Sequence, residues 1–136
     1  MGLAEKRVAK AFEANEFESI LKDIKNIVGK DITVNVDWKT LSTDGMSHLY
    51  NKAWPSVYFE PLTNALKSIC QDDMGKDALN DELETIIIKN EAGNSSANTW
   101  ASFENKTLTL DHKPTTNVHY VAERTKSLQT LLENNL

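Results

Sequence analysis

Three histidines are the side chains best suited to chemistry near neutral pH, because imidazole titrates there and also binds metals. They are His48, His112 and His119. Asp111 precedes His112, and His119 follows across a predicted strand-to-helix junction, so these groups could form a divalent-metal site or an acid–base pair. The spacing matches no metal signature such as H-E-x-x-H or C-x-x-C, and a surface histidine is the commoner finding at such a junction. We therefore predict no metal site, no cofactor and no catalytic residue.

Other catalytic patterns also lack support in the sequence. No G-x-S-x-G elbow surrounds the serines near His48, and the five glycines form no phosphate-binding loop. The stretch DDMGKDALNDEL is not a calcium loop, because Met74 and Asp77 occupy its third and sixth positions. Cys70 lies in the apolar stretch LKSIC, which indicates a buried side chain rather than a reactive thiol. These features favour a protein without catalytic activity but leave an enzyme open.

Acidic side chains concentrate within residues 72–91. They are Asp72, Asp73, Asp77, Asp81, Glu82, Glu84 and Glu91. Only Lys76 and Lys89 oppose them, so this segment accounts for the whole net charge of −5. An acidic patch can steer a basic protein partner, although a solvated helix surface is the commoner reason for one. We predict Asp77, Asp81 and Glu82 as partner-binding residues. No basic face is visible, which argues against nucleic-acid binding.

Aromatic side chains gather around residues 38–59. Aromatics anchor protein interfaces, line ligand pockets and fill ordinary cores. The alternative function is therefore a small-molecule-binding protein or an enzyme with a pocket between the sheet and the 38–59 segment. Its ligand-binding residues would be Trp38, His48, Trp54 and Tyr58.

Apolar periodicity predicts the elements that must position these residues. We expect helices over 3–28, 46–53, 56–71, 76–82 and 117–133, and strands at 31–38 and three times within 84–112. Pro61 places the start of regular helix in the 56–71 segment near Phe59 or Glu60, and Asp73 is the expected N-cap of the 76–82 helix. A tight hairpin is predicted at Glu104-Asn105-Lys106, because Asn tolerates a positive φ.

The element order α-β-(α)-α-β-β-β-α predicts an α+β fold with a four-stranded, mostly antiparallel sheet and helices mainly on one face. The place of the 31–38 strand in that sheet stays open. The chain has 136 residues, of which 40% are hydrophobic and 26% charged, which predicts one domain over 1–136.

The sequence contains no apolar run of membrane-spanning length, no signal peptide and a single cysteine, from which we expect a cytoplasmic protein that does not bind membranes. The leading interpretation is a small acidic protein-interaction module of the immunity, chaperone or adaptor kind. A homodimer through an exposed sheet edge or the first helix is a further possibility.

Overall fold

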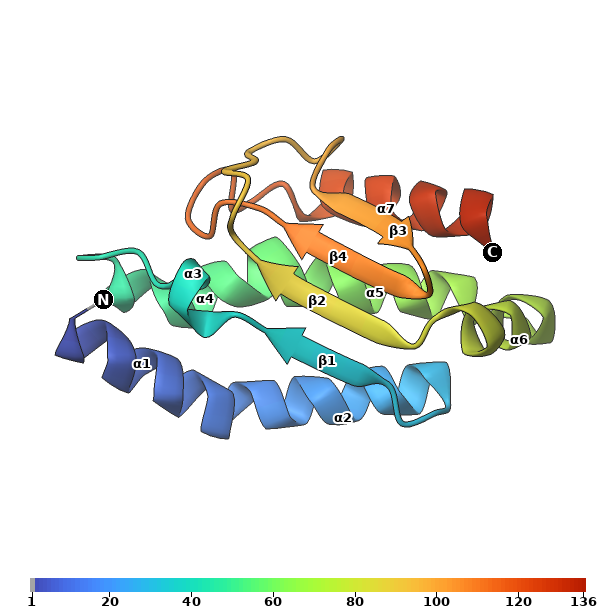
Figure 1. Ribbon diagram of the computed structural model, residues 1–136, viewed down its shortest axis with the longest axis horizontal. Coiled ribbons are helices and arrows are strands. Elements are labelled where there is room, and N and C mark those ends of the chain that lie inside the picture. Colours follow the sequence, from blue (N-terminus) through green and yellow to red (C-terminus); the bar gives the residue numbers. More distant parts are fainter. Residues whose placement is uncertain (1) are drawn as a thin grey trace.

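A computed structural model describes residues 2–136 and places a four-stranded sheet against a layer of helices (Figure 1). The strands are β1 (Thr33–Val36), β2 (Thr85–Lys89), β3 (Ala101–Glu104) and β4 (Thr107–Asp111). The helices are α1 (Leu3–Ala14), α2 (Glu16–Val28), α3 (Trp38–Leu41), η1 (Ser47–Leu49), α4 (Tyr50–Trp54), η2 (Pro55–Phe59), α5 (Glu60–Ile69), α6 (Asp73–Glu82) and α7 (Val121–Asn135).

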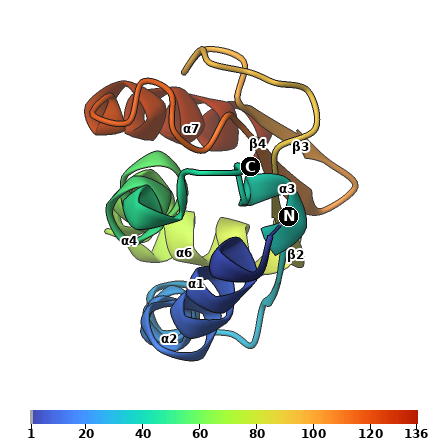
Figure 2. The same ribbon diagram turned by 90° about the vertical axis from the view of Figure 1, so that its left-hand side faces the viewer.

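The large helices lie on one face of the sheet, as Figure 2 shows from the end of the molecule. Strand alternation explains this asymmetry, because successive side chains point to opposite faces. Ile86 and Ile88 in β2 are fully buried under the helices, as are the two leucines of β4, whereas Ile87 and Thr109 on the open face are only partly covered. The predicted α+β class and the four strands are confirmed.

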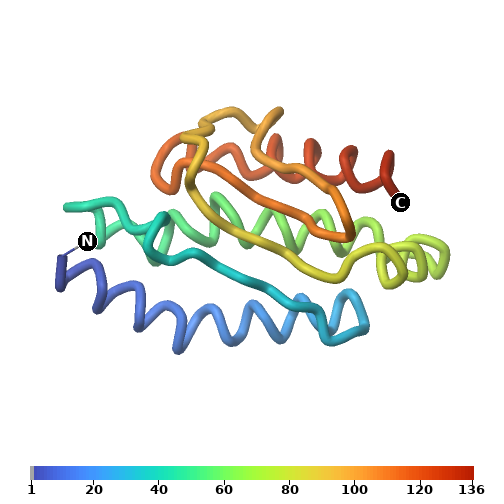
Figure 3. Tube along the Cα trace, viewed as in Figure 1, coloured from blue at the N-terminus to red at the C-terminus, as the bar shows by residue number. Residues whose placement is uncertain are grey.

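The predicted antiparallel arrangement is wrong, because the sheet is mixed and mostly parallel. Its strand order is β1-β2-β4-β3; β1 pairs with β2 and β2 with β4 in parallel, and only β3 and β4 are antiparallel. The chain makes its parallel β1–β2 connection through the helices between residues 38 and 82. After β2 it passes along residues 90–100 to the far edge, forms β3, and returns as β4 in the middle (Figure 3). Sequential strands are therefore not all neighbours.

The hairpin between β3 and β4 forms where it was predicted. Asn105 and Lys106 both have positive φ, at 53° and 60°, which matches a two-residue turn of the kind that suits twisted antiparallel strands. Before this hairpin, β3 begins at Ala101 and residues 97–99 form a turn.

The predicted N-terminal helix is divided at Asn15, where φ is −113° and ψ is −79°. The backbone N–H of Asn15 still bonds to Ala11, so α2 follows α1 with a change of direction. The strand predicted at 31–38 is shorter than expected, because Asp37 caps the short helix α3 through a hydrogen bond from the Thr40 N–H at 3.4 Å.

The helix predicted from Phe59 or Glu60 instead continues without a break from α4 through η2 into α5. A helix interior normally excludes proline, because its ring meets the carbonyl four residues back and its nitrogen carries no hydrogen. The chain accommodates Pro61 by widening into the π-helix η2, in which the Glu60 N–H bonds to Pro55 instead of Ser56. The partner of the Ser56 carbonyl in the same pattern would be Pro61, which has no N–H to give.

Two helix starts also differ from the predictions. The N-cap of α6 is Asp72, which accepts a hydrogen bond from the Gly75 N–H at 2.7 Å, rather than Asp73. The last helix begins at Val121 instead of residue 117, because Asn117 adopts a positive φ of 54° that ends regular structure there. Across residues 2–136, no helix combines the length and apolarity needed to span a membrane.

Candidate functional site

Two chargeable side chains, His112 and Arg124, are completely buried where β4, η2 and α7 meet. His112 follows the last residue of β4, Arg124 lies in the first turn of α7, and Tyr58 comes from η2. Trp100, just before β3, covers the histidine ring edge-on at a centroid distance of 6.3 Å. Buried polar groups are costly unless they are hydrogen-bonded, so their partners decide what the cluster does.

Arg124 bonds to three backbone carbonyls rather than to a carboxylate. Its Nη1 donates to Asn117 at 2.8 Å, and its Nη2 donates to Val118 at 2.8 Å and to Ser56 at 3.1 Å. The guanidinium therefore supplies the donor that Pro61 denies to the Ser56 carbonyl. Residues 117 and 118, which lead into α7, form no helix or strand. The hydrogen bonds from Arg124 to their carbonyls hold this part of the chain in place. Burial lowers the pKa of Arg124, partly offset by Glu123.

His112 is held from two sides through its ring and its backbone. Its Nδ1 lies 2.6 Å from the Lys113 carbonyl, which fixes the proton on Nδ1 in the neutral ring. Its own carbonyl accepts a hydrogen bond from the Tyr58 hydroxyl. Burial lowers the pKa of His112, with a further contribution from Arg124, and the carbonyls of Lys113 and Ser95 oppose this shift. Burial raises the pKa of the Tyr58 hydroxyl, because it disfavours the charged phenolate. The three groups join β4, η2 and α7 and have no open access.

The other two histidines do not join His112. His48 in η1 and His119 before α7 are exposed, and the His119 ring packs edge-on against the Tyr120 ring. Among the described residues, no group of three or more His, Cys, Asp or Glu side chains is arranged to hold a metal ion.

Asp111, the predicted companion of His112, holds the loop that follows β2. Its Oδ1 accepts hydrogen bonds from the backbone N–H groups of Glu91 at 3.0 Å and Ala92 at 3.2 Å. Asn94 then donates to the Asp111 carbonyl at 3.2 Å and accepts at its own backbone carbonyl from the Lys113 N–H at 2.7 Å. This carboxylate fastens the crossing loop to the end of β4, the strand that sits unexpectedly beside β2.

The aromatic residues predicted for ligand binding lie mostly in the core. Trp54 and Tyr58 are completely buried, Trp38 is half-buried and His48 is exposed. Trp54 stacks on Tyr50 at 4.3 Å and meets Trp38 at 5.3 Å, so the side chains fill the space between them. Four shallow surface hollows on the described part of the chain are lined by other residues than these. Ligand binding through this set stays a prediction.

The acidic residues predicted for partner binding all project from the exposed side of α6. Asp77, Asp81 and Glu82 are exposed, and none of them forms an ion pair with another described residue. The lysines nearby bond to the helix backbone: Lys30 donates to the Asn80 carbonyl at 2.5 Å and Lys106 to the Asp81 carbonyl at 3.2 Å. These two ammonium groups supply donors to carbonyls at the C-terminal end of α6, where positive charge is favourable. The carboxylates of Asp77, Asp81 and Glu82 face solvent.

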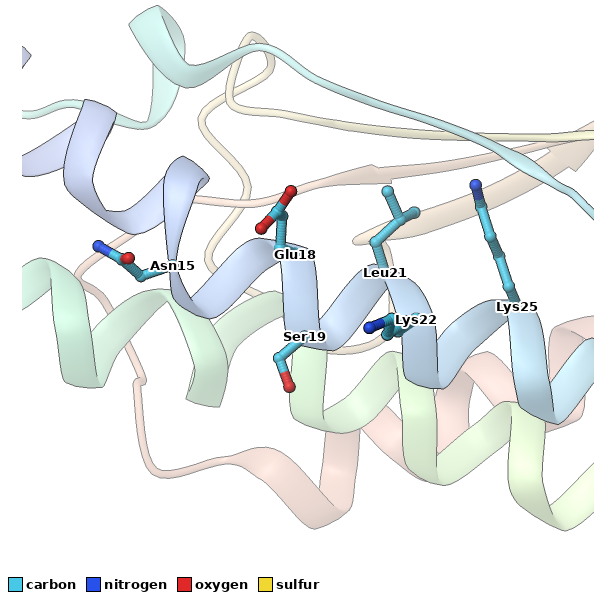
Figure 4. A pocket seen from close by; sticks show the side chains of 6 residues that line it. All are labelled: Asn15, Glu18, Ser19, Leu21, Lys22 and Lys25. Atoms are coloured by element: carbon cyan, nitrogen blue, oxygen red, sulfur yellow. The ribbon is translucent and has the colours of Figure 1, made fainter.

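The hollows themselves are open depressions, and the one lined by residues that include Asn117 and Glu123 lies beside the buried cluster. One lies on the outer side of α2 and is lined by Asn15, Glu18, Ser19, Leu21, Lys22 and Lys25 (Figure 4). Glu18, Leu21 and Lys25 point from the helix toward the layer of the sheet, and Ser19 points the other way. None of the residues lining this hollow was predicted from the sequence as a site residue.

Sequence reasoning also missed Arg124, although a signal for it was present. Arg124 falls three residues after Val121 and four before Leu128, so it lies on the apolar stripe of α7. A charged residue on such a stripe indicates a buried polar contact. Comparison of the chain with known protein families, with curated proteins and with solved structures gives no match.

Proposed function

We propose that this protein is a small acidic protein-interaction module without catalytic activity, and that it binds a basic partner through the acidic face of α6. The supporting observation is how charge is distributed around that helix. Asp77, Asp81 and Glu82 are exposed and free of ion pairs within residues 2–136, whereas Lys30 donates to a backbone carbonyl and Lys106 donates to another and is paired with Glu84. Neither these two lysines nor Lys76 on the same helix forms an ion pair with the three carboxylates that a partner would meet.

The chemistry-bearing residues elsewhere serve internal contacts, which is consistent with a binding role. The carboxylate of Asp111 accepts backbone N–H groups, the guanidinium of Arg124 donates to three carbonyls, and the Nδ1 of His112 faces another carbonyl. A catalytic group must reach a substrate, and His112 and Arg124 are sealed from solvent. Electrostatic attraction by an exposed acidic face needs no such access and acts mainly on the rate of association.

A charge-reversal experiment tests this proposal. The triple variant Asp77→Lys, Asp81→Lys, Glu82→Lys changes the net charge from −5 by +6 to +1. A matched variant, Glu13→Lys, Glu16→Lys, Asp23→Lys, makes the same change at exposed positions on α1 and α2. The probe is a fluorescent lysine-rich peptide, and association is followed by stopped flow at several salt concentrations.

The α6 variant should reduce the association rate of the peptide at least about tenfold at low salt and flatten its salt dependence. The matched α1–α2 variant should reduce it much less, because its substituted positions lie away from the proposed surface. Equal losses in the two variants would show that net charge alone acts, and an unchanged rate in the α6 variant would exclude this surface.

A further inference from the structure

The outer edge of β1 carries backbone hydrogen-bonding groups that the sheet does not use. The N–H groups of Thr33 and Asp37 bond to Glu84 at 3.2 Å and to Ile88 at 2.9 Å, so alternate residues of β1 face β2. Because backbone groups alternate in direction along a strand, the N–H and C=O of Val34 and Val36 face away from the sheet. Within residues 2–136 neither residue has a hydrogen bond on that side.

Helix α2 lies beyond this edge on the helical side of the sheet, as Figures 1 and 2 both show. A strand added beside β1 would therefore lie over α2, just as β1 itself lies over the helical layer. The side chains that α2 presents there are Glu18, Leu21 and Lys25 (Figure 4). Leu21 is half-buried, as are Val34 and Val36 of β1.

The charged residues on either side of Leu21 in α2 differ in sign and in whether they are paired. Glu18 is exposed and forms no ion pair among the described residues, whereas Lys25 is paired with Asp31 at 2.6 Å. An incoming side chain near Glu18 would therefore gain most from a positive charge, and one over Leu21 from an apolar group. Successive side chains on the same face of a strand are two residues apart, which places these preferences at alternate positions.

We propose that the β1 edge binds an extended segment of a partner protein as an antiparallel fifth strand, with an apolar residue over Leu21 and a basic residue two positions away over Glu18. The backbone of Val34 and Val36 offers two donors and two acceptors to that strand. In antiparallel pairing the partner residues opposite these valines place their side chains on the same face, toward α2. Affinity comes from the backbone and selectivity from α2, as in other cases of strand addition.

A second copy of this chain fits the edge less well. To place its own β1 alongside, that copy would bring its own α2 beyond the same edge, into the space that this α2 occupies (Figure 1). A single extended segment carries no such helix. The proposed surface is separate from the acidic face of α6, and neither proposal depends on the other.

The test uses the full chain, labelled with ¹⁵N, and the capped heptapeptide TKTVTKT, whose lysines and valine lie on one face of a strand. Saturating peptide should slow hydrogen exchange of the Val34 and Val36 amides at least about tenfold. The amides of Thr33 and Asp37, already bonded to β2, should change little. Two N-methylated peptides are matched controls: methylation of the central valine should abolish binding, and methylation of the following threonine should preserve it.

The variant Leu21→Asp should weaken peptide binding at least about tenfold, whereas Leu131→Asp, at a half-buried leucine of α7, should not. Unchanged exchange at Val34 and Val36 with about 1 mM peptide would overturn the proposal, as would equal binding of the two methylated peptides. The opposite preference between them would overturn the antiparallel arrangement. A dimer that protects these two amides without peptide would assign the edge to a second copy and overturn the proposed partner.

Discussion

The Nη2 of Arg124 donates a hydrogen bond to the Ser56 carbonyl at 3.1 Å and so joins the last helix to the π-helical turn. Pro61 lies five residues after Ser56 and has no N–H, so the carbonyl needs a donor from elsewhere in the chain. A residue 68 positions further along the chain therefore supplies the hydrogen-bond donor that the π-helical turn lacks.

Replacement of this arginine should destabilise the fold. Arg124→Met keeps much of the side-chain volume but leaves the carbonyls of Ser56, Asn117 and Val118 without their donor. We expect the free energy of unfolding to fall by about 2–4 kcal/mol, since hydrogen bonds to a charged donor are worth more than neutral ones. Urea denaturation followed by circular dichroism measures this change.

The control for that experiment is Lys126→Met, two residues away at an exposed position of the same helix. It should change the free energy of unfolding by less than about 0.5 kcal/mol. Arg124→Lys keeps the charge but not the planar group that reaches three carbonyls, so it should restore only part of the stability. Equal stability of Arg124→Met and the parent protein would show that the three hydrogen bonds contribute nothing net.

The elements of this fold were predictable where their side chains follow a local period. Phe17, Ile24 and Val28 recur at helical spacing and are buried in α2, and the hairpin at Asn105 follows from turn chemistry. Leu108 and Leu110 alternate and are buried in β4. Each of these patterns lies within one helix, strand or turn, so it can be recognised from the sequence alone.

Strand order was not predictable in the same way, because it depends on contacts between distant residues. The carboxylate of Asp111 binds the N–H groups of Glu91 and Ala92, which lie 20 and 19 positions earlier in the chain, and no period in the sequence indicates that contact. The exposed edge of β1 was equally hidden, since its position in the sheet follows from strand order. The histidines illustrate the same limit for the site: His112 is buried whereas His48 and His119 are exposed, and the sequence does not indicate that difference.

The role assigned to Asp111 leads to a second prediction. Asp111→Ala should release the start of the crossing loop and lower the free energy of unfolding by about 1–3 kcal/mol, because two backbone N–H groups lose a charged acceptor. Hydrogen exchange of the Glu91 and Ala92 amides should accelerate more than that of amides in β2. Asp111→Asn retains one carbonyl oxygen and should show a smaller effect. Unchanged exchange at these two amides would contradict the role of this carboxylate.

The buried imidazole predicts a pH dependence of stability. The pKa of His112 in the folded protein lies below its unfolded value, mainly because of burial. Below about pH 6.5 the unfolded chain takes up a proton that the folded protein resists, so stability is present above that pH and is lost as the pH falls. Between about pH 7.5 and 5.5, the free energy of unfolding should decrease by up to about 1.4 kcal/mol.

Thermal or urea unfolding of His112→Gln over the same pH range isolates this contribution. The variant should be less stable near neutral pH, yet its stability should change less between about pH 7.5 and 5.5. The double variant His48→Gln, His119→Gln removes two exposed imidazoles and should keep the pH dependence of the parent. If the double variant loses it instead, the exposed histidines are its source.

Neighbouring isoleucines of β2 provide a direct test of the sheet's two faces. Ile86 is fully buried under the helices, whereas Ile87 lies on the open face and is only partly covered. Ile86→Asp places a carboxylate without a partner in the core, and such burial is among the most costly single changes. We expect loss of more than about 4 kcal/mol and with it the cooperative unfolding transition.

Ile87→Asp makes the same chemical change one residue away, and water can still reach its side chain. We expect it to cost about 1 kcal/mol and to leave a cooperative transition at a lower midpoint. The comparison depends only on which face each residue occupies, because both variants have the same composition, charge and strand. Similar destabilisation of the two variants would mean that the open face of β2 is covered as well.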